Sequence, residues 1–222
     1  MPTNPPTRSR TYDAARTKET ILDAAEEIFA ELGYSAARID AIAKASGYNK
    51  SLIYQYFGDK LGLYTEVVKR ADQIGDQVTG RIIARLMNEG GVASDAAKFK
   101  SFLETTTRSM YEFLLEHPRY RKILYWEAAE EWKTWNRITY RPDDLTHLHE
   151  LAQSAKSNGI LRKDLDPALV PVLIMNVTTT TLQSFSRFGN LLGNADSQQR
   201  QKEIMEQLIQ IVIHGVMEPS SL

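Results

Sequence analysis

Apolar residues recur along this chain at spacings of three and four, the repeat of an α-helix that buries one face. The pattern predicts a first long helix near 14–32 that ends at Gly33. Its apolar stripe comprises Ile21, Leu22, Ala25, Ile28, Phe29 and Leu32. Later helices are expected at about 59–88, 94–116, 118–138, 142–158, 166–188 and 197–216. No segment alternates as a β-strand does, so the pattern predicts an all-α protein.

Two short helices separated by a tight turn are expected between Arg38 and Leu63. The first runs over about 39–46, where apolar residues at positions i, i+3 and i+4 make one buried stripe. Gly47 is expected to end it in the left-handed conformation, and Asn49 is a good N-cap for the helix that follows. We interpret the segment as a helix-turn-helix.

The second short helix, 50–57, separates into two faces on a helical wheel. Leu52, Ile53, Tyr56 and Phe57 form the core face, and Lys50, Ser51, Tyr54 and Gln55 form the free face. The free face offers hydrogen-bond donors and no acid, which suits phosphate oxygens and base edges in a major groove. Gly58 and Asp59 are expected to end this helix and cap the next. Lys60 then lies in a first helical turn, where a lysine is well placed for a phosphate.

These residues resemble the N-terminal domain of the TetR/AcrR family of one-component transcriptional regulators. The resemblance covers about residues 17–64 and rests on Ile42-Ala43, Ser46-Gly47, the run from Asn49 to Phe57, Asp59-Lys60 and Leu63. It implies that helix 50–57 enters the major groove of DNA. It also implies that Lys50, Ser51 and Tyr54 contact DNA while Lys60 holds the DNA backbone.

Two positions depart from the commonest pattern of that family. Leu52 stands where a threonine is frequent, and Arg38 stands where a hydroxyl often caps the first helix of the motif. Arg38 instead offers a charged ligand for phosphate. The candidate DNA-binding residues are Arg38, Asn49, Lys50, Ser51, Leu52, Tyr54, Gln55, Tyr56 and Lys60. The alternative is a three-helix packing unit whose polar face binds nothing.

Charge is balanced over the 222 residues, with 27 basic and 28 acidic side chains, so DNA binding requires a local basic patch. Such a patch is formed by Arg38, Lys44, Lys50 and Lys60, against only Asp40 and Asp59. The proline-rich arm over 1–13 is expected to be disordered, and its basic residues either lie along phosphates or form a solvated tail. Basic residues of the arm and of the helix after it are Arg8, Arg10, Arg16 and Lys18.

Enzymatic and metal chemistry find little support in the sequence. No cysteine is present, which excludes disulfides and thiolate metal sites and fits a reducing cytoplasm. The closest histidines, His147 and His149, are two apart on a helix and do not share a face. Asp143 with His147 is better read as an exposed helical pair than as a metal site. We expect no catalytic residue, metal or cofactor; the alternative is an all-helical enzyme or adaptor with a vestigial helix-turn-helix.

Membrane insertion is not expected either. The longest apolar run, 168–177, has about half the roughly 20 residues that a membrane span needs. The N-terminus has no apolar segment of the kind that a secretory signal requires. The sequence therefore predicts a cytoplasmic protein without a transmembrane helix.

We expect two domains: 1–58, an N-terminal arm with a three-helix helix-turn-helix domain, and 59–222, a helical ligand-sensing and dimerisation domain. In the helix expected at 118–138, one arc carries Tyr120, Leu124, Tyr125, Ala128, Trp132 and Trp135, and the opposite side carries Glu127, Glu130 and Glu131. Aromatic walls with few polar groups are typical of a small-molecule site. The candidate effector-binding residues are Arg108, Tyr111, Tyr125, Trp126, Trp132, Asn176 and Thr180. The alternative for the aromatic residues is plain core.

The helices expected at 166–188 and 197–216 are apolar over more than one face, which predicts pairing with a second copy in a four-helix contact. The interpretation as a whole is a homodimeric transcriptional regulator that binds double-stranded DNA at a palindromic operator. We expect a repressor that a small hydrophobic or aromatic effector releases from DNA.

Overall fold

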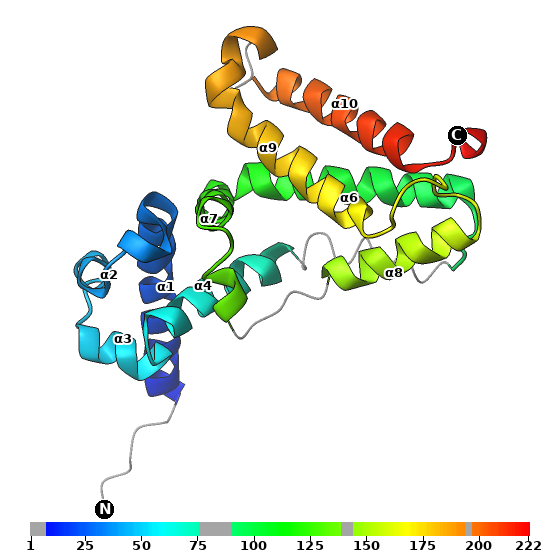
Figure 1. Ribbon diagram of the computed structural model, residues 1–222. Coiled ribbons are helices and arrows are strands. Elements are labelled where there is room, and N and C mark those ends of the chain that lie inside the picture. Colours follow the sequence, from blue (N-terminus) through cyan, green and yellow to red (C-terminus); the bar gives the residue numbers. More distant parts are fainter. Residues whose placement is uncertain (1–7, 76–89, 139–143, 194–196) are drawn as a thin grey trace, which may run out of the picture. The chain divides into compact units, whose positions relative to one another are not determined.

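The computed structural model describes residues 8–75, 90–138, 144–193 and 197–222 (Figure 1). The described residues are helices and their connections, with one isolated β-bridge between Leu161 and Met217, which confirms the all-α prediction. The chain forms two compact units. The first consists of residues 1–72 and 118–141, and the second of residues 73–117 and 142–222.

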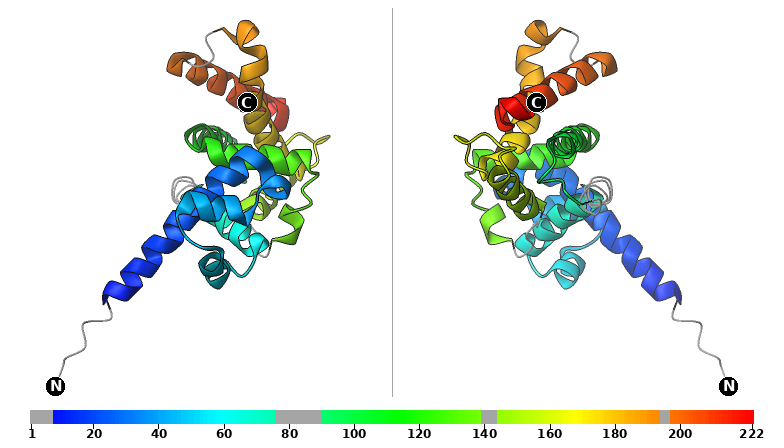
Figure 2. Two further views of the ribbon diagram at one scale, coloured as in Figure 1. Left: turned by 90° about the vertical axis from the view of Figure 1, so that its left-hand side faces the viewer. Right: turned by 90° about the vertical axis from the view of Figure 1, so that its right-hand side faces the viewer.

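The first unit contains five α-helices among the described residues. They are α1 (Arg8–Ala36), α2 (Ile39–Ser46), α3 (Lys50–Phe57), α4 (Lys60–Gly75) and α7 (Pro118–Ala129), followed by the 3-10 helix η2 (Trp135–Arg137). Helix α1 packs against α2 and α7, and α2 packs against α3 (Figures 1 and 2). The part of the connector helix that we expect beyond residue 75 lies outside the described residues.

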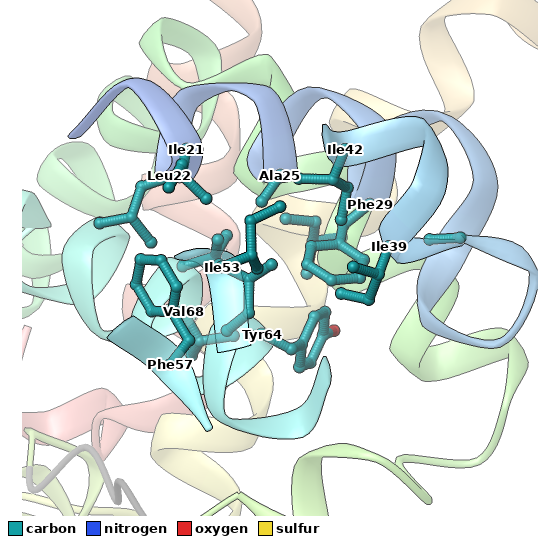
Figure 3. Close-up of a cluster of buried hydrophobic side chains, with 14 of the residues drawn as sticks. Ile21, Leu22, Ala25, Phe29, Ile39, Ile42, Ile53, Phe57, Tyr64 and Val68 are labelled. Atoms are coloured by element: carbon teal, nitrogen blue, oxygen red, sulfur yellow. The ribbon is translucent and has the colours of Figure 1, made fainter. Parts of the chain in front are cut away.

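The core of this unit explains why α3 has one fixed face. Buried side chains come from every one of its first four helices: Ile21, Leu22, Ala25, Phe29, Ile39, Ile42, Ile53, Phe57, Tyr64 and Val68 (Figure 3). Ile53 is fully buried and Phe57 is 7% exposed, so both residues anchor α3 on the other helices. Burial of two large apolar side chains stabilises this arrangement by about 1.5–3 kcal/mol each.

Helix α1 differs from its expected bounds at both ends. It begins at Arg8, six residues earlier than the pattern predicts, because the helix-disfavouring prolines of the arm end at Pro6. The regular helix stops at Gly33, as predicted, at φ 71° and ψ 171°, and one further helical turn reaches Ala36. Leu32 was expected in the buried stripe but is 45% exposed. A helical wheel predicts the direction of a side chain, but not whether a neighbour covers it.

Helix α7 is shorter than predicted, and its buried face only partly overlaps the expected aromatic arc. It ends at Ala129 rather than near residue 138, because Glu131 and Trp132 both adopt positive φ, at 59° and 58°. Glu127 was expected on the exposed side, yet it is 2% exposed. The buried residues of α7 are Tyr120, Ile123, Leu124 and Glu127, which follow the i, i+3, i+4, i+7 spacing of one face.

The second unit contains four α-helices among the described residues. They are α6 (Ala96–Glu116), α8 (Asp144–Ser157), α9 (Leu169–Leu192) and α10 (Gln198–Val216), with the 3-10 helix η3 (Pro219–Ser221) near the end of the chain. Helix α6 packs against both α9 and α10, and α9 also contacts α8 and α10. Throughout the described parts of both units, no helix is long and apolar enough to cross a membrane.

Candidate nucleic-acid interface

The turn before α3 is built as its residue types predict. Gly47 closes α2 in the left-handed conformation, at φ 76° and ψ 8°. The side-chain oxygen of Asn49 accepts a hydrogen bond from the backbone N–H of Leu52 at 2.9 Å and so caps α3. The left-handed turn at Gly47 and the cap by Asn49 fix where α3 begins and place Lys50 as its first residue.

Helix α3 presents the two faces that the helical wheel predicts. Ile53 and Phe57 are buried, and Leu52 and Tyr56 are half-buried. The exposed face consists of Lys50, Ser51, Tyr54 and Gln55, with Tyr54 45% exposed. This face combines an ammonium, two hydroxyls and an amide, all groups that donate hydrogen bonds to phosphates or base edges.

Lys50 does not lie alone on this face. Its Nζ atom is 2.5 Å from Oδ1 of Asp40, in the first turn of α2. The hydrogen bond to Asp40, together with the charge of this carboxylate, raises the pKa of Lys50 above its ordinary value. In the sequence, Asp40 stands out only as an acid within the basic patch. The pairing joins α2 to α3 and has no sequence signal, because ten residues and a turn separate the partners.

Lys60 is held at the start of α4 by residues in the last turn of α1. Its Nζ atom lies 4.5 Å from the centroid of the Tyr34 ring and 3.4 Å from the backbone oxygen of Ser35. Burial lowers the pKa of Lys60, and the charge of Glu130 opposes this shift. Asp59 caps α4, since its Oδ1 accepts from the backbone N–H of Gly62 at 2.7 Å. The lysine thus has a defined position in the first turn of α4.

Arg38 precedes α2 and is exposed. It occupies the N-cap position with an extended backbone and makes no side-chain capping bond. Its backbone oxygen accepts from the N–H groups of Ala41 and Ile42. The side chain is therefore not needed to close the helix, which leaves it available for an anion.

Helix α7 braces α1 within the same unit. The indole Nε1 of Trp126 donates to the backbone oxygen of Ala30 at 3.2 Å. The ring also covers Gly33, where an added Cβ would lie 2.9 Å from Trp126 Cδ2. Near the end of α7, Glu130 accepts a hydrogen bond from Ser35 at 2.8 Å. Contacts with α7 therefore reach the same turn of chain that holds Lys60.

A buried carboxyl group connects α7 to α4. Oε1 of Glu127 accepts a hydrogen bond from the hydroxyl of Tyr64 at 2.5 Å, and Oε2 accepts from the backbone N–H of Trp135 at 2.9 Å. Burial raises the pKa of Tyr64, and the hydrogen bond to Glu127 raises it further, so the phenol remains a neutral donor. The sequence offered no signal for this network, because its three members come from separate segments.

The candidate effector-binding residues are distributed over both units. Tyr125, Trp126 and Trp132 belong to the first unit; Arg108 and Tyr111 lie on α6, and Asn176 and Thr180 on α9, in the second. Trp132 is half-buried and lies edge-on to the ring of Trp135. Tyr125 is also half-buried, and burial raises the pKa of its phenol.

Arg108 and Asn176, two of the candidates in the second unit, use their polar groups in contacts with a neighbouring helix or their own helix. Arg108 makes a bidentate ion pair with Glu206 of α10, at 2.5 and 3.0 Å. The amide of Asn176 donates to the backbone oxygen of Val172 one turn earlier. Tyr111 is buried and Thr180 is exposed. A hollow of about 280 Å³ in this unit, lined by Gly91, Val92, Ala93, Ser94, Leu151, Ser154 and Asn158, includes none of these four residues.

The helix-turn-helix region matches a known family. Residues 21–67 match the family model described as bacterial regulatory proteins, tetR family. The transcriptional repressor NicS of Pseudomonas putida is 24% identical over 160 residues, which are 70% of this chain and 71% of that protein. The transcriptional activator FasR of Mycolicibacterium smegmatis is 32% identical over 98 residues, and the match spans only 44% of either chain.

The fold is also similar to solved structures. A transcriptional regulator from Streptomyces coelicolor superimposes with a TM-score of 0.65 over 90% of this chain and 98% of its own, at 21% sequence identity. At this identity the likeness concerns the fold. It extends beyond the helix-turn-helix into both compact units.

Proposed function

Because this chain is a member of the TetR family of transcriptional regulators, which are not enzymes, we propose that it binds a palindromic operator as a homodimer and represses transcription. The single observation that carries the DNA-binding proposal is the exposed face of α3, held in place by the burial of Ile53 and Phe57 on its other side. We retain the division into residues 1–58 for DNA binding and residues 59–222 for sensing and dimerisation.

Each proposed DNA contact has a role that follows from its chemistry. Lys50, Ser51, Tyr54 and Gln55 face base edges, while Arg38 at the start of α2 and Lys60 at the start of α4 bind phosphates. Asn49, Leu52 and Tyr56 lie at the border of the exposed face, where they contact the sugar-phosphate backbone. A regulator that acts on chromosomal DNA works in the cytoplasm.

Homodimerisation is supported by apolar side chains that remain exposed on α9 and α10. Leu191 is 81% exposed, Ile211 59%, Val172 51% and Leu169 50%. Water contact with such residues is unfavourable, and a second copy of the same surface removes it for both partners. Two copies of α3 would then face two half-sites about one helical turn of DNA apart.

Repression is supported by NicS, a repressor that matches over most of its length. For release, we propose a small hydrophobic or aromatic effector that contacts the aromatic residues of the first unit, Tyr125, Trp126 and Trp132. Only an effector that prefers one conformation over another changes DNA affinity. The hydrogen bond from Trp126 to Ala30 can couple effector binding to a change of conformation, because an effector that displaces α7 also disturbs α1.

Selection of bound duplexes from a random pool tests the DNA-binding proposal. The full-length protein at physiological salt is expected to enrich one palindromic sequence, with a Kd for that duplex about 10³-fold or more below its Kd for random DNA. A pool that stays random after repeated rounds, with a folded protein, would contradict the proposal.

A further inference from the structure

The ion pair between Asp40 and Lys50 lies at the N-terminal end of α3, where the exposed face of this helix begins. Lys50 Nζ is 2.5 Å from Asp40 Oδ1, and the two side chains are 50% and 68% exposed. An exposed pair of this kind contributes little to folding stability. Asp40 also lies in the first turn of α2, where a negative charge interacts favourably with the helix dipole, but that role does not require contact with Lys50.

A carboxylate at a DNA-binding surface weakens binding to every sequence, and the contacts that its partner lysine keeps decide how much affinity is lost on each one. Phosphates repel Asp40, and they attract Lys50 away from it. An ammonium group has three N–H donors, so one hydrogen bond to Asp40 leaves two for a base. The O6 and N7 atoms of guanine form the acceptor pair that lysine contacts most often in the major groove. Lys50 can therefore keep its bond to Asp40 while it reads a guanine.

We propose that Asp40 is a specificity-determining positioning residue, which holds the ammonium group of Lys50 at the start of α3 so that Lys50 reads a guanine edge and does not act as a general phosphate-binding cation. The inference rests on the proposed function, because it assumes that α3 enters the major groove. It assigns to Asp40 a role in discrimination: the carboxylate weakens binding to non-cognate DNA more than binding to the operator.

The test compares Asp40→Asn with the wild-type protein on two probes: the duplex that the wild-type protein selects, and a random-sequence duplex of the same length. Asp40→Asn removes the charge and keeps the size of the side chain. On random DNA we expect binding to tighten by about three- to tenfold, and the slope of log Kd against log salt to steepen by about one per bound subunit, because the freed Lys50 now neutralises a phosphate. On the selected duplex, Kd should change less than about twofold.

Two further variants separate positioning from a structural role. In a Lys50→Ala background, Asp40→Asn should leave the salt slope unchanged, since no lysine remains to be released. Glu31→Gln, which removes one charge from an exposed position on α1, serves as the matched control and should leave the ratio of the two Kd values unchanged. Selection repeated with Asp40→Asn should lose the preference for guanine at the position that Lys50→Ala also relaxes, and at no other.

Three results would overturn the inference while leaving the proposed function intact. One is an Asp40→Asn protein that matches wild type on both duplexes. Another is equal weakening on both duplexes with a lowered melting temperature, which would make Asp40 a structural residue. The third is a changed preference at a base that Lys50→Ala does not affect, which would mean that Asp40 contacts a base itself. Failure of the wild-type protein to select any duplex would instead contradict the proposed function.

Discussion

Gly62 lies so close to the end of α3 that a Cβ atom there would be 2.0 Å from the backbone oxygen of Phe57. The oxygen belongs to the backbone and cannot rotate away, so Gly62→Ala must shift α4 relative to α3. We expect a loss of about 1–3 kcal/mol in the free energy of unfolding, measured by denaturant titration. Gly215→Ala is the control, because an added Cβ there would meet nothing within 4 Å beyond its chain neighbours and the adjacent backbone of α10, so the helix should gain up to about 1 kcal/mol. Equal effects of the two substitutions would contradict this account of the α3–α4 junction.

The buried hydrogen bond between Tyr64 and Glu127 joins α4 to α7. Tyr64→Phe removes one hydroxyl and leaves Oε1 of Glu127 without this donor, so we expect the free energy of unfolding to fall by about 1–3 kcal/mol. Tyr54→Phe removes the same hydroxyl from an exposed position on α3. Its free energy of unfolding, measured by thermal melting, should change by less than about 0.5 kcal/mol. Similar losses in both proteins would show that the bond to Glu127 contributes nothing specific.

At the scale of elements, Arg70 joins α4 to three turns of α1. Its side chain is 19% exposed, and its guanidinium pairs with Asp23 at 2.7 Å, with Glu19 at 3.3 Å and with Glu26. Arg70→Met would leave three neighbouring carboxylates without this cation. We expect the free energy of unfolding to fall by about 1–3 kcal/mol. The loss should become smaller at high salt, because salt screens the repulsion among the three carboxylates.

Lys69→Met is the matched control for the Arg70 prediction. The side chain of Lys69 is 40% exposed and pairs with Glu66 of the same helix at 3.7 Å, so its replacement should lower the free energy of unfolding by less than about 0.5 kcal/mol. Calorimetric melting of both variants at low and high salt separates the two cases. If Arg70→Met melts like Lys69→Met at low salt, the carboxylates of α1 do not hold α4.

The bounds and faces of a helix can be predicted from the sequence where they depend on residues close together in the chain. The bounds of α2 and α3 follow from Gly47 and Asn49, and the two faces of α3 follow from helical periodicity alone. The end of α7 and the burial of Glu127 were not predictable, since they depend on docking against α1 and α4, about 60 to 100 residues away in the chain. The same limit hid the pairing of Asp40 with Lys50, because sequence patterns do not reveal which charges meet across a turn.

The proposed dimer requires that the exposed apolar side chains of α10 contact the second copy. Ile211→Glu places a charge on a residue that is 59% exposed in the single chain, so the fold should persist while self-association weakens by at least about tenfold. Leu32→Glu, at 45% exposure on α1, is the control and should leave association unchanged. Sedimentation at micromolar concentration measures both. A dimer that tolerates Ile211→Glu and dissociates with Leu32→Glu would place the interface elsewhere.

The central claim is that α3 reads bases with its exposed face while Lys60 holds a phosphate from the start of α4. The most direct measurement is the affinity of Lys50→Ala and Lys60→Ala for the selected duplex and for its single-base variants over a range of salt concentrations. Lys60→Ala should weaken binding to all duplexes alike and reduce the salt slope by about one per subunit. Lys50→Ala should cost about 1–3 kcal/mol on the selected duplex and abolish discrimination at one base position in each half-site. Equal losses from both substitutions on every duplex, with discrimination retained, would contradict the claim.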